Sequence, residues 1–229
     1  MVKTRIGNRM VVLPQRRGTL PGVNDAHRNI KSYEALMQAA RKNERAGDEQ
    51  GALSCYTRAL KINPSSMDAA YNRASSLLLL GWKPEAIQAF TVVIAAGRVN
   101  NPFYYIALIE RGATYRVLED LPAAARDFLE VYSNCDGPNR AMAAINLGGI
   151  VETQEALTYF DTAATIFLEH MDIPRQRDYY YMALFYKGIT LCRLERMEEG
   201  IKCFEIVARI TNPVQREAEQ ILYTLARQR

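Results

Sequence analysis

The sequence lacks the features of a membrane-spanning, secreted or metal-dependent protein. No apolar run approaches the roughly 18–20 residues that a membrane-spanning helix needs, and the first residues lack the short apolar stretch of a secretory signal peptide. The four cysteines, Cys55, Cys135, Cys192 and Cys203, form no CxxC pair and have no histidine cluster beside them, so they fit no zinc site. We expect a soluble intracellular protein with reduced thiols, no metal and no other cofactor.

Catalytic patterns are equally scarce. The only two histidines are His27 and His170, and neither a GxxxxGK[ST] nor a GxGxxG phosphate-binding pattern occurs. No serine, cysteine or aspartate stands in the strand–turn–helix context that nucleophile motifs need. We therefore expect that the protein is not an enzyme.

The net charge of +4 is unevenly distributed along the chain. Residues 1–31 carry a net charge of +6, which leaves −2 for the remainder. A body so close to neutral has little electrostatic drive to bind nucleic acid. The basic residues of the first segment are Lys3, Arg5, Arg9, Arg16, Arg17, Arg28 and Lys31.

Residues 1–30 show no helical periodicity and contain Pro14, Pro21 and three glycines. Such a segment buries too little apolar surface to offset its chain entropy, so we predict an extended basic N-terminal arm. We favour a docking arm whose apolar residues enter an apolar site, on a partner or in the protein's own groove, while its arginines meet an acidic surface. A mitochondrial presequence and a solvated tail without a role are alternatives. The expected arm contacts are Arg5, Arg9, Val11, Val12, Leu13, Arg16 and Arg17.

After residue 31 the pattern changes to amphipathic helices of about a dozen residues, paired by short turns. A small residue in each first helix is followed by a second small residue and, four residues later, by an aromatic residue. Two antiparallel helices approach closely only where one presents a small side chain, and the aromatic ring then fills the gap. The first small residues are Ala40, Ala74, Gly112, Gly148 and Gly188; the second are Ala52, Ala86, Ala124, Ala163 and Gly200; the aromatics are Tyr56, Phe90, Phe128, Phe167 and Phe204.

This repeated pattern resembles the tetratricopeptide repeat family. The resemblance implies an all-α, right-handed α-solenoid of five helix–turn–helix repeats and a C-terminal capping helix. Residues 31–229 would form this solenoid. The fourth repeat departs from the pattern by about three extra residues near 152–156, and its register stays open. The expected repeats are 33–66, 67–100, 105–138, 141–176 and 181–213, followed by the capping helix at 214–228.

The resemblance also implies a superhelical groove that is lined by the first helix of each repeat and holds peptide or protein ligands. The position three residues before the first small residue is apolar in every repeat, which predicts an apolar stripe along this groove. In the alternative interpretation, neighbouring helices cover these positions and they form core. The stripe is Met37, Tyr71, Ile109, Ile145 and Phe185, and Arg41, Asn72, Arg116 and Ile189 are further expected groove contacts.

One tetratricopeptide subfamily clamps the C-terminal carboxylate of chaperones with lysine, asparagine and arginine at fixed groove positions. Asn72 matches one of these positions, whereas Met37, Arg41, Ile106 and Glu110 occupy the others. Because Glu110 would repel a carboxylate, we do not expect such a clamp.

The sequence thus predicts a non-catalytic adaptor or scaffold subunit of a larger assembly, which captures an apolar or amphipathic segment of a protein partner. A transient assembly factor or co-chaperone is the first alternative, and an RNA-associated helical-repeat protein is the second. Nucleic acid is a disfavoured partner, and we expect no membrane insertion. We expect a cytoplasmic location, with cytoskeletal or ciliary assemblies included, and mitochondria as the alternative.

Overall fold

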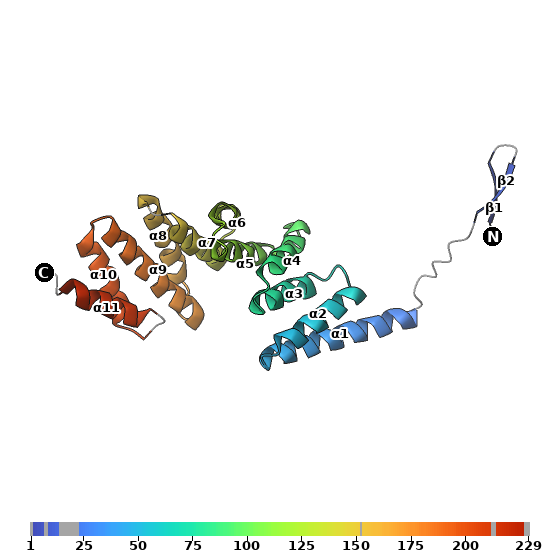
Figure 1. Ribbon diagram of the computed structural model, residues 1–229, viewed down its shortest axis with the longest axis horizontal. Coiled ribbons are helices and arrows are strands. Elements are labelled where there is room, and N and C mark those ends of the chain that lie inside the picture. The colour runs from blue at the N-terminus through green and yellow to red at the C-terminus, as the bar shows by residue number, and fades with distance from the viewer. Residues whose placement is uncertain (1, 7–8, 14–22, 152, 212–213, 227–229) are drawn as a thin grey trace. The chain divides into compact units, whose positions relative to one another are not determined.

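The computed structural model of the chain describes residues 2–6, 9–13, 23–151, 153–211 and 214–226. The chain divides into two compact units, Met1–Ser65 and Ser66–Arg229 (Figure 1). The first unit contains β1 (Val2–Ile6), β2 (Arg9–Leu13), α1 (Val23–Arg45) and α2 (Glu49–Ile62). The second contains α3 (Met67–Leu79), α4 (Lys83–Ala95), α5 (Tyr104–Val117), α6 (Leu121–Asn134), α7 (Gly137–Ile150), α8 (Gln154–Leu168), α9 (Pro174–Arg193), α10 (Met197–Ala208) and α11 (Gln215–Ala226).

The N-terminal segment contains a two-stranded antiparallel hairpin. Strands β1 and β2 pair with Val2 opposite Leu13 and Ile6 opposite Arg9. In the sequence, Gly7 and Asn8 stand between them, and this dipeptide is typical of a two-residue hairpin loop. The prediction of an extended arm did not include this strand pairing.

The predicted boundary of the arm at residue 30 is wrong, because α1 already begins at Val23. Residues 23–30 contain neither proline nor glycine. Extending a helix that is already nucleated costs much less than starting one, so the part of α1 that packs on α2 continues back to this point.

The small and aromatic residues of the repeat pattern lie at the contacts between paired helices. All ten small residues are buried, and the five aromatic side chains have at most 1% of their surface exposed. A β carbon on Gly188 would lie 2.8 Å from Cε1 of Phe204, which is closer than carbon atoms pack. Glycine is therefore required where α9 meets α10.

Short turns of recurring geometry join the two helices of a repeat. The carboxylate of Asp48 accepts a hydrogen bond from the backbone N–H of Gly51 at 2.8 Å and so caps α2. Asp120 caps α6 in the same way, accepting from the backbone N–H of Ala123 at 3.1 Å. These caps satisfy N–H groups that have no partner within the helix.

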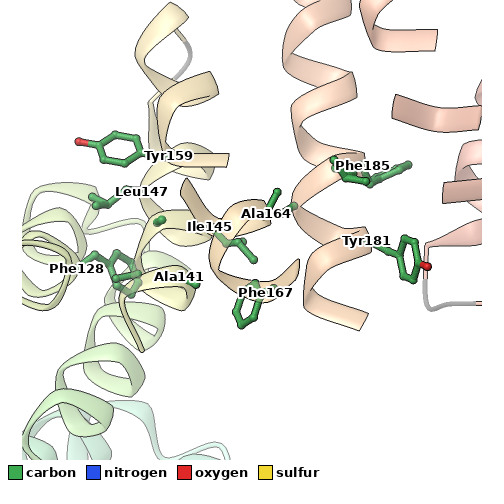
Figure 2. Packing of buried hydrophobic residues seen from close by; sticks show 14 of the residues in the cluster. Phe128, Ala141, Ile145, Leu147, Tyr159, Ala164, Phe167, Tyr181 and Phe185 are labelled. Atoms are coloured by element: carbon green, nitrogen blue, oxygen red, sulfur yellow. The ribbon is translucent and has the colours of Figure 1, made fainter. Parts of the chain in front are cut away.

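In the second unit, each helix packs against the next one in the chain, and α7 also contacts α5 and α9. The largest core cluster runs through these layers from α5 to α11. Figure 2 shows part of it, with Phe128 from α6, Ile145 from α7, Phe167 from α8 and Phe185 from α9. No single pair of helices could enclose such a cluster, so stacking provides the core.

The fourth repeat has no insertion, because its two helices match those of the third repeat in length to within one residue. Helix α7 ends at Ile150 and α8 begins at Gln154, a connection as short as that between α5 and α6. The ring that packs on Gly148 is Phe160, whose Cζ would lie 2.7 Å from a β carbon there. The predicted three-residue insertion near 152–156 is therefore wrong. The small–aromatic pair of this repeat is Ala156 with Phe160, which stands about two helical turns before the predicted pair, Ala163 with Phe167.

Helix α9 begins at Pro174, before the predicted start of the fifth repeat at 181. Proline is compatible with the first turn of a helix, because its missing N–H would have no partner there. The C-terminal helix α11 has the predicted capping pattern. Ala218 is buried, Ile221 and Leu222 pack on the core cluster, and Glu217, Glu219 and Gln220 are exposed.

Candidate binding groove

A cavity of about 480 Å³ lies between the first helices of three successive repeats in the second unit. Because consecutive helices run antiparallel, α5, α7 and α9 run in the same direction and contribute equivalent faces. We call this cavity the groove. Its lining residues are Ile109, Glu110, Ala113 and Arg116 from α5; Met142, Ile145, Asn146, Gly148 and Gly149 from α7; Val151, which follows α7; Phe160 from α8; Tyr179, Met182, Tyr186, Ile189, Thr190 and Arg193 from α9; and Leu194, which follows α9.

The middle of the groove is apolar. Met142 and Ile145 of α7 line it together with Ile189 of α9. The ring of Tyr186 stacks on Phe160 with 6.0 Å between ring centroids and meets Phe185 edge-on at 5.6 Å, so packing holds this ring in place. Such a surface takes up apolar side chains of a ligand.

Two adjacent glycines of α7 have different surroundings. Gly148 is buried against Phe160, so helix packing accounts for it. Gly149 is exposed, and beyond its own helix no described atom lies within 4 Å of the place where its β carbon would be. Gly149 therefore leaves the backbone of α7 bare inside the groove, where a ligand can approach it closely.

One end of the groove carries a half-buried acid. Burial raises the pKa of the Glu110 carboxyl above its ordinary value, and the guanidinium of Arg175 partly opposes this shift. The Nε–H of Arg175 donates to the hydroxyl of Tyr179, which lines the groove, at 3.0 Å. Arg175 and Tyr179 lie in the first turns of α9, so Glu110 marks the end of the groove at which α9 begins.

The other end of the groove is basic. Arg116 lies about two helical turns beyond Glu110 on α5, and Arg193 lies in the last turn of α9. Arg116 and Arg193 are both exposed, and both line the groove. Between the two ends, the Nδ2 of Asn146 donates to the carbonyl of Met142 at 2.9 Å, which orients the amide on the wall formed by α7.

The structure places four of the nine expected groove residues together, namely Ile109, Arg116, Ile145 and Ile189. Ile109 and Ile145 are nevertheless 7% and 9% exposed, so most of each side chain contributes to helix packing. Phe185, at 7% exposure, packs edge-on against Phe204 at 5.8 Å and does not line this groove.

The other expected groove residues lie elsewhere. Met37 is 5% exposed in α1, and Arg41 is exposed on the same helix in the first unit. The ring of Tyr71 stacks on Phe103 with 4.9 Å between centroids. The amide of Asn72 donates to Asp68 Oδ1 at 2.6 Å and to the Asp68 carbonyl at 2.9 Å, so both hydrogen bonds are local to α3.

Sequence reasoning missed several lining residues, because it centred the groove face one residue too early on each helix. Glu110, Asn146 and Tyr186 each directly follow a stripe residue and line the groove, whereas the stripe residues themselves are largely buried. One residue is about 100° on a helix, so this small offset exchanges packing positions for surface positions. Met142 and Met182 also line the groove, and each stands three residues before a stripe residue, Ile145 or Phe185. Their apolar character was the available signal for the centre of the open face.

The expected arm contacts cannot be compared with the groove. Arg16 and Arg17 lie outside the described residues. For Arg5, Arg9, Val11, Val12 and Leu13, the structure describes the backbone as strand and not the side chains. Within the part of the chain that is described, no group of three or more histidine, cysteine, aspartate or glutamate side chains is placed to hold a metal ion. None of the described helices is long and apolar enough to cross a membrane.

Comparison with known proteins supports the fold. Residues 37–101 match the family model described as tetratricopeptide repeat. A mouse protein, FK506-binding protein-like, is 36% identical over 115 residues, which represent 47% of this chain and 31% of that protein. The match therefore spans about a third of the length of this relative.

Solved structures of low sequence identity share the architecture. The chain aligns with PilF of Pseudomonas aeruginosa at a TM-score of 0.62 and 16% identity, covering 87% of this chain and 86% of that one. It aligns with YrrB, a TPR protein with an unusual peptide-binding site, at a TM-score of 0.58 and 19% identity, covering 87% and 97%. MamA from Desulfovibrio magneticus aligns at a TM-score of 0.58 and 14% identity, covering 78% and 94%.

The helix pairs, their recurring small–aromatic contacts and the family match agree on one assignment. The predicted α-solenoid is confirmed by the stacked helix pairs and by these neighbours. Residues 37–101 match the tetratricopeptide repeat family, and the described helices share the α-solenoid fold of these solved structures.

Proposed function

We propose that this protein is a non-catalytic adaptor that holds an apolar or amphipathic segment of a protein partner in the groove between α5, α7 and α9. The tetratricopeptide fold supports protein–protein interaction in general. YrrB, whose fold is similar, has a peptide-binding site. The proposal for this chain depends on its own groove residues.

The observation that carries the proposal is the bare backbone at Gly149 beside an apolar wall. Met142, Ile145 and Ile189 offer apolar surface, and no described side chain fills the space above Gly149. A cavity of about 480 Å³ accommodates a few side chains of a peptide. The amide of Asn146 adds a polar group that can hydrogen-bond to a peptide backbone.

We further propose that the adaptor is a subunit of a larger assembly and that its basic N-terminal segment contacts an acidic surface of a partner. The net charge of +6 on residues 1–31 supports this second contact. The four free cysteines support a reducing compartment such as the cytoplasm. A stable subunit is expected to co-purify with its partners in stoichiometric amounts at high salt, whereas a transient factor is lost.

The groove is tested by filling it. A peptide array is screened with the full-length protein, and binding of the selected peptides is measured by fluorescence polarisation. The variant Gly149→Phe places a ring in the groove and is expected to weaken binding at least tenfold. Gln88→Phe adds the same ring at an exposed position of α4 and is the matched control. Selected peptides that bind Gly149→Phe as tightly as the wild type would contradict the proposal.

A further inference from the structure

The two ends of the groove have opposite charges on a single helix. Glu110 and Arg116 both lie on α5 and both line the groove. A separation of six residues places them about 9 Å apart along the helix axis. Between them the lining is Ala113 on the same helix, with Ile145 and Ile189 on the neighbouring helices. A ligand that follows α5 therefore meets an acid, an apolar stretch and a base in turn.

Glu110 lacks a local partner. Among the residues that the structure describes, its carboxylate forms neither a hydrogen bond nor an ion pair, and burial raises its pKa. Arg175 lies near enough to influence it, but the Nε–H of Arg175 is engaged by the Tyr179 hydroxyl. Partial burial of a charge without a hydrogen-bonding partner is unfavourable, and an ammonium or guanidinium group of a ligand would remove this cost.

Arg116 is available at the opposite end. Its side chain is exposed, and within the described ranges it makes no hydrogen bond or ion pair. Arg193 lines the same end of the groove and adds to the positive field there. This end is complementary to a carboxylate, whereas the Glu110 end repels one.

We propose that the partner segment held in the groove carries a lysine or arginine that meets Glu110, apolar residues in the middle, and an aspartate or glutamate that meets Arg116. This inference rests on the proposed function and adds the chemical class and the orientation of the ligand. In a segment with polyproline II geometry, which has three residues per turn and rises about 3.1 Å per residue, charged residues three positions apart point the same way and lie about 9 Å apart, which matches the distance along α5. The two charges fix the direction in which the segment lies.

The test uses four fluorescein-labelled peptides of one length with the cores Lys-Leu-Leu-Glu, Gln-Leu-Leu-Glu, Lys-Leu-Leu-Gln and Gln-Leu-Leu-Gln. The full-length wild type is expected to bind the first peptide most tightly. Loss of the lysine is expected to weaken binding about tenfold, because Glu110 is half-buried. Loss of the glutamate is expected to weaken it by roughly two- to threefold, because Arg116 is exposed.

Variants of the protein assign each effect to its residue. The Glu110→Gln variant is expected to bind peptides with and without the lysine equally tightly. The Arg116→Gln variant is expected to bind peptides with and without the glutamate equally tightly. Glu85→Gln and Arg126→Gln remove exposed charges on α4 and α6, outside the groove, and are the matched controls. Persistence of the full lysine effect in Glu110→Gln would overturn the inference.

The failures of the two proposals are distinguishable with the same reagents. If all four peptides bind the wild type equally and Gly149→Phe abolishes binding, the groove is the ligand site but its charge selectivity is refuted. If none of the four peptides binds the wild type, the charge pattern is refuted, whereas the groove itself is judged by the array-selected peptides. If all of these peptides bind Gly149→Phe as well as the wild type, both proposals are refuted.

Discussion

Gly112 of α5 and Phe128 of α6 pack so closely that a β carbon on Gly112 would lie 2.9 Å from Cε1 of the phenylalanine ring. The ring is fully buried, and its Cζ would be only 3.0 Å away. The same contact recurs between Gly188 and Phe204 in the last repeat. The close approach of paired helices in these repeats thus depends on a missing methyl group.

Gly112→Ala is therefore expected to lower the free energy of unfolding by about 1–3 kcal/mol, because the added methyl overpacks the contact with Phe128. In an exposed helix the same substitution would stabilise the protein. Urea unfolding followed by circular dichroism measures the change. If Gly112→Ala is as stable as the wild type, the two helices can move apart to admit the methyl group without any loss of free energy of unfolding.

Gly149→Ala tests the opposite case on α7. No described atom beyond its own helix lies within 4 Å of the added carbon, so only helix propensity changes. We expect an increase of about 0.5–1 kcal/mol in the free energy of unfolding. Comparison with Gly112→Ala in the same urea titration controls for the chemistry of the substitution. Destabilisation by Gly149→Ala would contradict the description of the groove as open at this point.

Glu119 has a left-handed backbone conformation, with φ at 63°, in the turn between α5 and α6. The equivalent residue before α2 is Gly47, with φ at 74°, for which this conformation is unstrained. Glu119→Gly is expected to stabilise the protein by about 0.5–1 kcal/mol, because it removes the clash of the β carbon. Differential scanning calorimetry measures the change, and Glu119→Ala, which keeps a β carbon, is expected to give no gain.

Glu110→Gln is expected to alter the pH dependence of stability. Burial raises the pKa of this carboxyl in the folded protein above its ordinary value of 4.5, so the folded state binds the proton more tightly than the unfolded chain. The wild type then loses stability as the pH rises through the folded-state pKa, and the glutamine variant does not. The variant should melt at a higher temperature near neutral pH, and the difference should disappear at about pH 4 and below.

Thermal melts by circular dichroism between about pH 4 and pH 8 test this expectation. Glu85→Gln, which removes an exposed carboxylate on α4, controls for the general loss of a negative charge. A Glu110→Gln variant that is less stable than the wild type at neutral pH would show that the folded protein already pairs this carboxylate.

The repeat architecture was predictable because it depends on local spacing. Ala40 and Ala52 recur as a pair at equivalent places in the other repeats, and an aromatic residue such as Tyr56 follows one helical turn later. Helical periodicity and steric fit then leave antiparallel pairs as the arrangement that buries these side chains. The confirmed fold class, the buried small residues and the capping pattern of α11 all follow from this regularity.

The fourth repeat was misjudged because two small–aromatic pairs compete within α8. Ala156 with Phe160 and Ala163 with Phe167 have the same spacing, and all four side chains are buried. Spacing does not show which ring packs on Gly148. The small residue that keeps the ordinary spacing of the pattern is the buried Ala144, one helical turn before Gly148, and it pairs with Ala156 and Phe160.

By itself, the sequence determined that the chain folds into stacked helix pairs and that the N-terminal segment is basic. It also determined which small and aromatic side chains lie between the paired helices. The tertiary structure alone decided which face of each first helix stays open: Ile145 is mostly covered, whereas Asn146 and Gly149 border the groove. The physical reason is that periodicity identifies an apolar face only to within about one residue, or about 100° of rotation. Whether a residue at the edge of that face is packed or open depends on the neighbouring helices, which pack on it from distant parts of the chain.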